Sequence, residues 1–274
     1  MVESNLSRWA LRVATWATLA FIYIPLFVIG LYAFNKARSQ AWPIEGLTLK
    51  WFDKALHNEG VRHALKLSII AALGATGVAL LLGTLASLAV QRFRFFGRET
   101  ISFLVILPLA LPGIVTGMAL NATFREVLSP FGLGLGLFTV IVGHATFCIV
   151  VVYNNTVARL RRLAGNLEEA SMDLGADLWQ TFRFVTFPQL RTALLAGGLL
   201  AFALSFDEII VTTFTAGAQE TLPIWIFTNL SRPNQLPIVN VVALVLIILS
   251  MIPVYFAQRI ASVAVQPGTG GGTR

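Results

Sequence analysis

Six long apolar stretches dominate this chain of 274 residues. They cover about residues 13–34, 64–90, 100–123, 138–158, 190–214 and 239–261. Each is at least as long as the roughly 20 apolar residues that a helix needs to cross the hydrocarbon core of a bilayer. Continuous runs of this length differ from the alternating segments of about ten residues that build a membrane barrel. The pattern therefore predicts an all-α integral membrane protein with six transmembrane helices.

Composition agrees with a membrane setting, since 56% of the residues are hydrophobic and only 12% are charged. The net charge of +7 would fit nucleic-acid binding in a soluble protein. Here the arginines lie beside the apolar stretches, where they set orientation and meet anionic headgroups. The bilayer is therefore the expected partner of these charges, and no nucleic acid is expected.

The basic residues of the short loops predict the orientation of the chain. Positive residues favour the cytoplasmic side, and the loops after the third and fifth stretches carry only Arg125 and Arg232. The opposite loops are richer, with Arg92, Arg94, Arg98, Arg159, Arg161 and Arg162. Both termini and the segment 159–190 are therefore predicted to be cytoplasmic. The basic residues of the loop 35–63 run against this assignment.

The segment 159–190 is polar and has the signals of a helical hairpin. Asn166 is a plausible N-cap, and Gly175 can supply the left-handed stop of a first helix. A second short helix is predicted from about Asp177, before Pro188 opens the fifth stretch. Such a hairpin would stand outside the bilayer, where another protein can grip it.

The hairpin contains a spaced motif. It begins with Glu169-Ala170-Ser171, continues after three residues with Gly175, and ends after nine more with Val185-Thr186-Phe187-Pro188. It resembles the coupling-loop signature of the permease subunits of bacterial binding-protein-dependent ABC importers. Ser171, Val185 and Phe187 are mild departures from that signature. Together with the stretches 107–117 and 203–208, the whole chain looks closest to the second permease of spermidine/putrescine importers.

The resemblance implies a type I ABC importer permease architecture, with one permease domain over 1–274 and a coupling helix that rests on a cytoplasmic ATPase. Glu169, Ala170 and Gly175 match the signature and are the coupling residues that the resemblance implies. Glu168, Ser171 and Asp173 beside them are expected to belong to the same coupling surface. It also implies a second homologous permease, two copies of the ATP-binding subunit and an extracytoplasmic substrate-binding protein. The expected location is the bacterial inner membrane, and the glycine-rich tail 266–274 is expected to be flexible.

No catalytic or metal site is expected in this chain. It has no G-x-x-x-x-G-K-[ST] loop, so ATP and Mg²⁺ are expected on the partner ATPase and no cofactor on this chain. His144 and Cys148 lie on one helical face, but they lack the further ligands of a metal site and are interpreted as packing residues. Ser205, His144 and Asp207 are not expected to form a catalytic triad, because nothing in the sequence places them in the required geometry.

Asp207 and Glu208 lie inside the fifth apolar stretch, where a charge costs ~2.5 to 3.5 kcal/mol. They either attract a cationic substrate along the path or act as an interhelical lock or helix-end charge. On a continuous helix adjacent side chains point ~100° apart, so both would not face one path. Asn121 is a further candidate for lining it, and Pro108 and Pro112 indicate a kinked or broken third stretch.

These features favour an importer permease, with polyamines as the expected substrate. Three alternatives remain open from the sequence. The chain could serve another small solute, it could be an ion-coupled secondary transporter that uses Asp207 or Glu208, or it could be a membrane anchor that recruits a partner through the hairpin.

Overall fold

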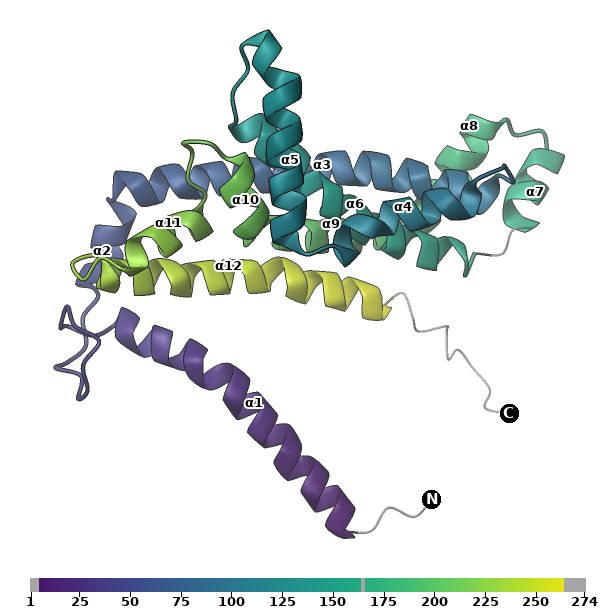
Figure 1. Cartoon of the computed structure of the whole chain (residues 1–274). Coiled ribbons are helices and arrows are strands. Elements are labelled where there is room, and N and C mark those ends of the chain that lie inside the picture. Colours follow the sequence, from purple (N-terminus) through teal and green to yellow (C-terminus); the bar gives the residue numbers. More distant parts are fainter. Residues whose placement is uncertain (1–4, 164–165, 264–274) are drawn as a thin grey trace. The chain divides into compact units, whose positions relative to one another are not determined.

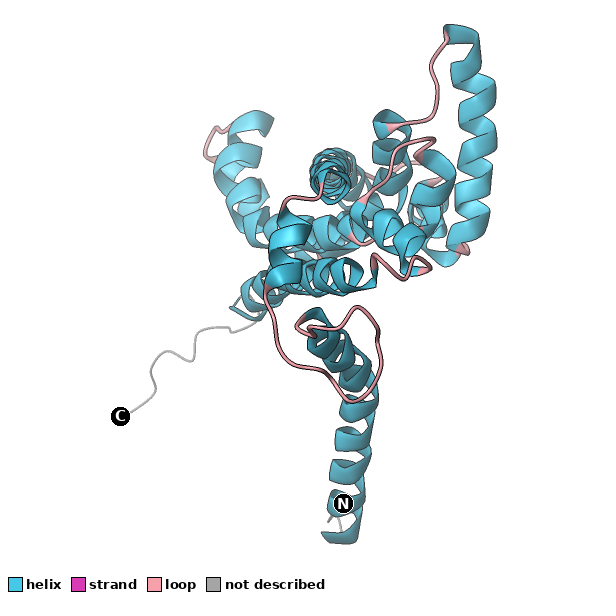
Figure 2. Ribbon diagram, turned by 90° about the vertical axis from the view of Figure 1, so that its left-hand side faces the viewer, coloured by secondary structure: helices cyan, strands magenta, loops and turns pink. Residues whose placement is uncertain are grey.

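The computed structural model describes residues 5–163 and 166–263, so the predicted tail 266–274 lies outside it. Apart from one isolated bridge between Asn35 and Leu47, the regular structure in these ranges is helical (Figures 1 and 2). The elements are α1 (Asn5–Ala33), α2 (Lys50–Leu56), α3 (Glu59–Arg92), α4 (Arg98–Ala110), α5 (Gly113–Leu128), η1 (Ser129–Phe131), α6 (Leu137–Leu160), α7 (Asn166–Asp173), α8 (Leu178–Thr181), η2 (Phe182–Thr186), α9 (Phe187–Phe206), α10 (Ile210–Thr215), α11 (Leu222–Leu230) and α12 (Leu236–Val263).

Five helical segments in the described part of the chain are long and apolar enough to cross a membrane. They are Ser7–Ala33, Glu59–Arg92, Leu137–Leu160, Leu178–Phe206 and Leu236–Ile260. A sixth span results if α4 and α5, which are separated by a sharp bend, are taken together. The six predicted apolar stretches therefore correspond to these segments.

The third predicted stretch is not one straight helix. α4 and α5 meet at an angle of 106° across a short break. Leu111 is extended there, with φ −82° and ψ 144°, and Pro112 stands just before α5. A proline disfavours the helical conformation of the preceding residue and has no N–H to donate, which explains the break at this position. Pro108, in contrast, lies inside α4 without ending it.

The fifth predicted stretch, 190–214, is wrong as a continuous helix. α9 ends at Phe206, α10 begins at Ile210, and residues 207–209 between them are not helical. At its other end the helix extends further than predicted, because α8, η2 and α9 follow one another without a gap from Leu178.

The chain divides into two compact units, Met1–His63 with Trp225–Ile248 and Ala64–Ile224 with Leu249–Arg274. The expectation of one permease domain stays a prediction. In the first unit, the side chain of Trp51 on α2 is buried and its Nε1–H donates to the carbonyl of Asn35 at 2.8 Å. The rings of Phe34 and Phe52 are also in contact, tilted by 38° with their centroids 4.9 Å apart. These contacts attach α2 to the chain that follows α1.

The core of the second unit lies where α3, α6, α9 and α10 meet, and small side chains let these helices approach closely. A Cβ at Gly83 of α3 would lie 3.0 Å from the carbonyl oxygen of Ile149 on α6. Gly197 of α9 faces Asn155 on the same helix α6. The buried residues of this core are Ala75, Ala79, Phe147, Cys148, Val152, Ala201 and Val211.

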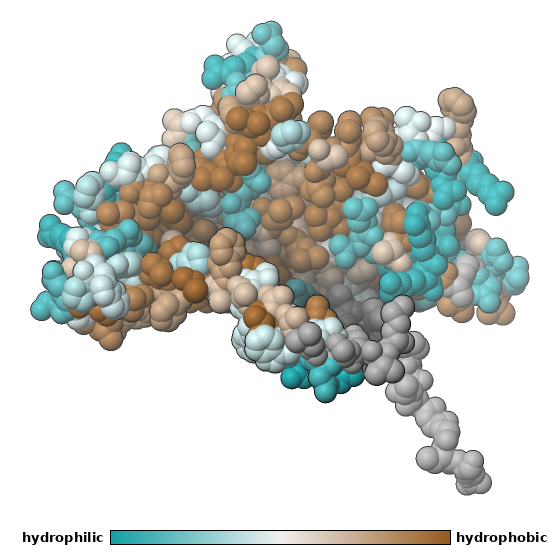
Figure 3. Space-filling view, turned by 60° about the horizontal axis from the view of Figure 1, so that its bottom comes forward, coloured by the Kyte–Doolittle hydropathy of each residue, from teal (hydrophilic) through white to brown (hydrophobic). Residues whose placement is uncertain are grey.

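Much of the surface is apolar, as expected of helices that face lipid or other membrane subunits. Figure 3 shows broad brown areas on the face that it presents. On α1, for example, Phe21 is 82% exposed and Phe27 is 70% exposed. Exposing broad apolar areas of this kind to water would be energetically unfavourable.

Candidate functional site

The predicted hairpin is present, and Gly175 ends its first helix. The N–H of Ala176 donates to the carbonyl of Ser171 at 3.1 Å, and the N–H of Gly175 donates to that of Met172 at 2.9 Å. This pair of bonds is a Schellman motif, and it requires a left-handed residue at the position of Gly175. Gly175 has φ +90°, a conformation that side chains with a Cβ adopt at a cost. The predicted role of Gly175 as the stop of α7 is confirmed.

The second helix of the hairpin begins at a capping box. The N–H of Gln180 donates to Asp177 Oδ1 at 2.8 Å, and the N–H of Asp177 donates to Gln180 Oε1 at 3.0 Å. The hydroxyls of Ser171 and Thr181 lie 3.2 Å apart and join the two helices. The start predicted from about Asp177 is therefore confirmed.

A π-helical turn, η2, connects α8 to α9. It ends at Thr186, two positions before Pro188, which has no N–H to donate to the carbonyl four residues earlier and whose ring clashes with that carbonyl. A π-helical turn widens the helix locally and relieves such a clash. Pro188 therefore does not start a separate helix but sits within the first turn of a helix that continues from the hairpin.

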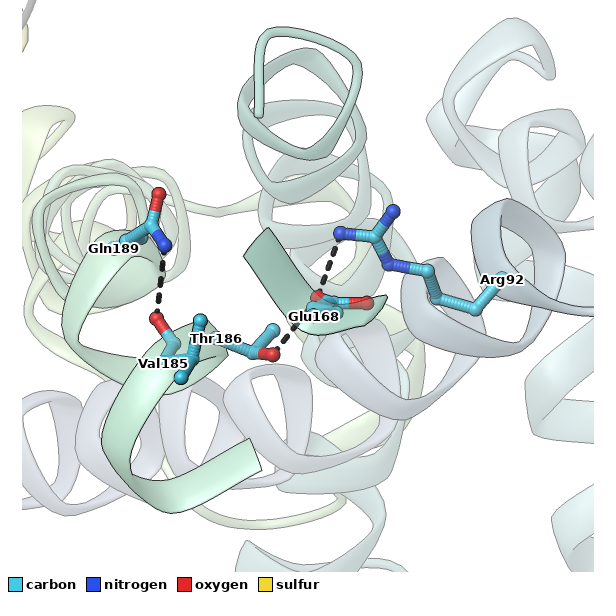
Figure 4. A network of polar contacts seen from close by, with 5 residues as sticks. All are labelled: Arg92, Glu168, Val185, Thr186 and Gln189. Carbon is cyan, nitrogen blue, oxygen red and sulfur yellow. Dashed lines mark hydrogen bonds and ion pairs between the residues drawn. The ribbon is translucent and has the colours of Figure 1, made fainter. Parts of the chain in front are cut away.

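Glu168 anchors the hairpin to the rest of its unit (Figure 4). Its Oε1 accepts from Arg92 Nη2 at 2.7 Å and from the hydroxyl of Thr186 at 2.8 Å. These contacts tie α7 to the end of α3 and to η2, over sequence separations of 76 and 18 residues. The sequence grouped Glu168 with the coupling residues, but the structure turns its carboxylate inward.

The outward surface of the hairpin combines carboxylates with apolar side chains. Glu169 and Asp173 are exposed, and within the described ranges neither carboxylate has a hydrogen bond or an ion pair. Leu174 is 90% exposed and Leu178 is 78% exposed. Leucines so exposed on a polar hairpin are typical of a surface that another protein covers.

The break between α4 and α5 lies beside the break between α9 and α10. Gly113 and Gly117, one turn apart on α5, face Ile210 and Phe214, one turn apart on α10. A Cβ at Gly117 would lie only 2.6 Å from Phe214 Cδ2. Two interrupted helices therefore meet in one place, an arrangement found at the binding sites of some transporters.

This close approach predicts the effect of enlarging Gly117. Gly117→Ala should lower the free energy of unfolding by about 1 to 3 kcal/mol, because the added methyl group overpacks the contact with Phe214. Thermal unfolding of the purified protein in detergent measures the change. Gly77→Ala is the matched control, since nothing lies within 4 Å of a Cβ there. Equal midpoints for the two variants would contradict the packing of α5 on α10.

The residues predicted to line the substrate path are Asp207, Glu208 and Asn121, and their side chains make different contacts. Glu208 Oε1 accepts from the N–H of Val211 at 2.9 Å, so this carboxylate stabilises the first turn of α10. Asp207 is exposed, and its carboxylate has no hydrogen bond or ion pair to any other residue in 5–163 or 166–263. Both polar atoms of the Asn121 side chain have partners. Its amide nitrogen donates to the carbonyl of Phe214, and its Oδ1 accepts from Arg125 Nε at 2.9 Å. Asn121 thus fastens α5 to α10.

His144 has a larger role than simple packing. Its Nδ1 lies 2.8 Å from Ser205 Oγ, and its Nε2 lies 2.7 Å from Thr212 Oγ1. His144 and Ser205 are therefore in contact, but they do not form a triad with Asp207. The second ring nitrogen is taken by Thr212 and not by a carboxylate, and all three side chains are buried. Cys148 packs in the core as predicted, with its Sγ 3.3 Å from the carbonyl oxygen of Ala201.

Comparison with known proteins finds relatives over most of the chain. It is 33% identical over 228 residues to the putrescine transport system permease protein PotI of Escherichia coli (strain K12), covering 81% of this chain and 80% of PotI. It is 31% identical over 258 residues to the spermidine/putrescine transport system permease protein PotC of Haemophilus influenzae, covering 93% of this chain and 98% of PotC.

Two solved structures share the fold at low sequence identity. A bacterial ABC transporter involved in the import of the acidic polysaccharide alginate matches with a TM-score of 0.68 and 16% identity, over 97% of this chain and 100% of that one. The MetNI methionine ABC transporter matches with a TM-score of 0.57 and 18% identity, over 76% of this chain and 100% of that one. Residues 75–266 also match the family model of the binding-protein-dependent transport system inner membrane component. The chain is therefore a multi-pass membrane permease that belongs to this family of ABC importer subunits.

Proposed function

We propose that this chain is the permease subunit of an ATP-driven importer for polyamines such as spermidine and putrescine. It forms half of the translocation path together with a second homologous permease. A substrate-binding protein delivers the polyamine from outside, and two cytoplasmic ATPase subunits, which carry ATP and Mg²⁺, supply the energy. Both termini and the hairpin lie on the cytoplasmic side.

The outward surface of the hairpin is the observation that carries the coupling part of this proposal. Glu169 and Asp173 offer carboxylates to basic groups of an ATPase, and the exposed Leu174 offers apolar area beside them. Glu168, held by Arg92 and Thr186, braces the hairpin against α3 and η2. A displacement of the hairpin by an ATPase would therefore be transmitted to the membrane helices, because these contacts fix the hairpin to them.

The assignment of polyamines as the substrate is supported by similarity to PotI, a putrescine permease, and to PotC, a spermidine/putrescine permease. It is also supported by the position of Asp207. A protonated polyamine is an alkyl chain that carries two or more ammonium groups. A carboxylate without an ion pair, beside two broken helices, attracts such a cation. Asp207 is the preferred path residue because its carboxylate is exposed, whereas Glu208 stabilises α10 and Asn121 fastens α5. Glu208 and Asn121 then shape the path beside it.

The test is uptake of labelled spermidine and putrescine by cells that lack this chain. The native chain should restore uptake, while Glu169→Lys and Asp207→Asn should not, at equal amounts in the membrane. A native chain that fails to restore uptake would contradict the polyamine assignment. Restoration by both variants would contradict the coupling and path roles.

A second measurement separates this proposal from ion-coupled transport. Uptake should persist when the proton gradient is dissipated at constant cellular ATP, because the energy comes from ATP. Loss of uptake under that condition would favour an ion-coupled mechanism through Asp207 or Glu208. Co-purification of an ATPase with the native chain, and its loss in the Glu169→Lys chain, would support the coupling surface directly.

A further inference from the structure

The side chain of His144 bridges the interruption between α9 and α10. It projects from α6 and reaches Ser205, near the end of α9, with Nδ1 at 2.8 Å. Its Nε2 reaches Thr212 in α10 at 2.7 Å. At most 3% of any of these three residues is exposed. One buried imidazole therefore holds both sides of residues 207–209.

The hydrogen bonds around Thr212 assign the proton of the imidazole. The Thr212 hydroxyl lies 2.8 Å from the carbonyl oxygen of Glu208, which can only accept, so Thr212 donates its single proton there. Its oxygen then accepts from an Nε2–H of His144. Nδ1 is left without a proton and accepts from the Ser205 hydroxyl. A neutral imidazole thus serves both hydroxyls.

This bridge is incompatible with an uninterrupted helix. Ser205 and Thr212 are seven positions apart, which corresponds to about 10.5 Å along a continuous α-helix. Two hydrogen bonds and the width of one imidazole ring span at most about 8 Å. The two hydroxyls come within reach of one ring because the helix is broken between them. Conversely, while His144 keeps both bonds, the segment cannot straighten into a helix.

The sequence of the segment does not impose the break by itself. Residues 207–209 are Asp, Glu and Ile, with no proline or glycine to interrupt a helix locally. Glu208 is held through its carbonyl by Thr212 and through its carboxylate by the N–H of Val211. Asp207, the neighbour of Glu208, is exposed.

We propose that His144 is a positioning residue for transport, which keeps α9 and α10 interrupted through Ser205 and Thr212 and so fixes where the Asp207 carboxylate is presented. This inference rests on the proposed function, in which Asp207 meets the substrate. His144 itself is buried, and its part in transport is to hold the segment through Ser205 and Thr212.

The chain offers a matched pair of variants for the test. Thr212 and Thr215 are both fully buried in α10, and each hydroxyl donates to the carbonyl four residues earlier. Only Thr212 also contacts His144. Thr212→Val and Thr215→Val therefore make the same isosteric change, and their difference isolates the bond to His144. Thr212→Ser keeps the hydroxyl and serves as the conservative variant.

The first readout is local and independent of substrate. In the assembled importer, Asp207→Cys is labelled with a water-soluble maleimide, and the parent chain, whose single cysteine is the buried Cys148, gives the background. Adding Thr212→Val should change the labelling rate about three- to fivefold, the effect of losing one buried hydrogen bond on a conformational equilibrium. Adding Thr215→Val or Thr212→Ser should leave it within about twofold.

The second readout is polyamine uptake in chains that keep Asp207. Thr212→Val should reduce uptake, and Thr215→Val and Thr212→Ser should not, at equal membrane amounts. Equal labelling rates for Thr212→Val and Thr215→Val would overturn the positioning role. A changed labelling rate in Thr212→Val while uptake stays at the native level is a separate outcome. That result would support the positioning of the segment by His144 but would overturn the role of Asp207 in the proposed function. If Thr212→Val does not reach the membrane, Ser205→Ala removes the other bond and carries the same expectation.

Discussion

Gly175→Val is expected to abolish polyamine uptake while the chain still reaches the membrane. Gly175 has φ +90°, and left-handed backbone costs an ordinary residue about 1 to 2 kcal/mol, with a β-branched residue at the unfavourable end. α7 has only eight residues, so little intrinsic helix stability resists that strain. The two Schellman bonds would be lost, and the surface around Glu169 would lose its shape. Uptake and immunoblotting of membranes measure the two effects.

Gly97→Val is the matched control for this change. Gly97 also has positive φ, at +84°, and for both glycines a Cβ would meet nothing within 4 Å. The two substitutions therefore impose similar backbone strain without a clash, at different places in the chain. Equal loss of uptake in both variants would show that strain in general, and not the shape of the hairpin, causes the defect. Full uptake by the Gly175→Val chain would contradict the role of the turn in coupling.

Identical substitutions at the neighbouring residues Glu168 and Glu169 should have separate effects. Glu168→Ala should lower the free energy of unfolding by roughly 1 to 3 kcal/mol, since it leaves the half-buried Arg92 guanidinium and the Thr186 hydroxyl without this acceptor. Glu169→Ala removes an exposed carboxylate and should leave thermal stability unchanged. It should instead weaken co-purification of the ATPase and reduce uptake.

Thermal unfolding in detergent and ATPase co-purification, each measured on both variants, distinguish the two roles. A double-mutant cycle with Arg92→Ala adds the coupling energy between Arg92 and Glu168, which should be smaller than the full effect of Glu168→Ala because Thr186 also loses its acceptor. A loss of stability in the Glu169→Ala chain, or a native midpoint in the Glu168→Ala chain, would contradict the assignment of inward and outward carboxylates.

The local sequence was sufficient to predict the hairpin. Its helix starts and stops depend on groups only a few residues apart, such as Asp177 with Gln180 and Gly175 with the carbonyls of the preceding turn. The bend at Pro112 was also predictable, because proline acts on its own neighbours. Apolar length alone predicted the number of membrane segments.

The sequence by itself therefore determined an all-helical membrane chain, the number of its apolar stretches and the helix starts and stops of the hairpin, since each follows from short-range bonding or from the thickness of the bilayer. The tertiary structure decided that Glu168 turns inward to Arg92, 76 positions away, and that His144 meets Ser205 and Thr212, more than 60 positions away. It also decided the break at 207–209, which no proline or glycine marks. Bonds over such separations exist only once the helices pack, because packing brings distant side chains within hydrogen-bonding distance.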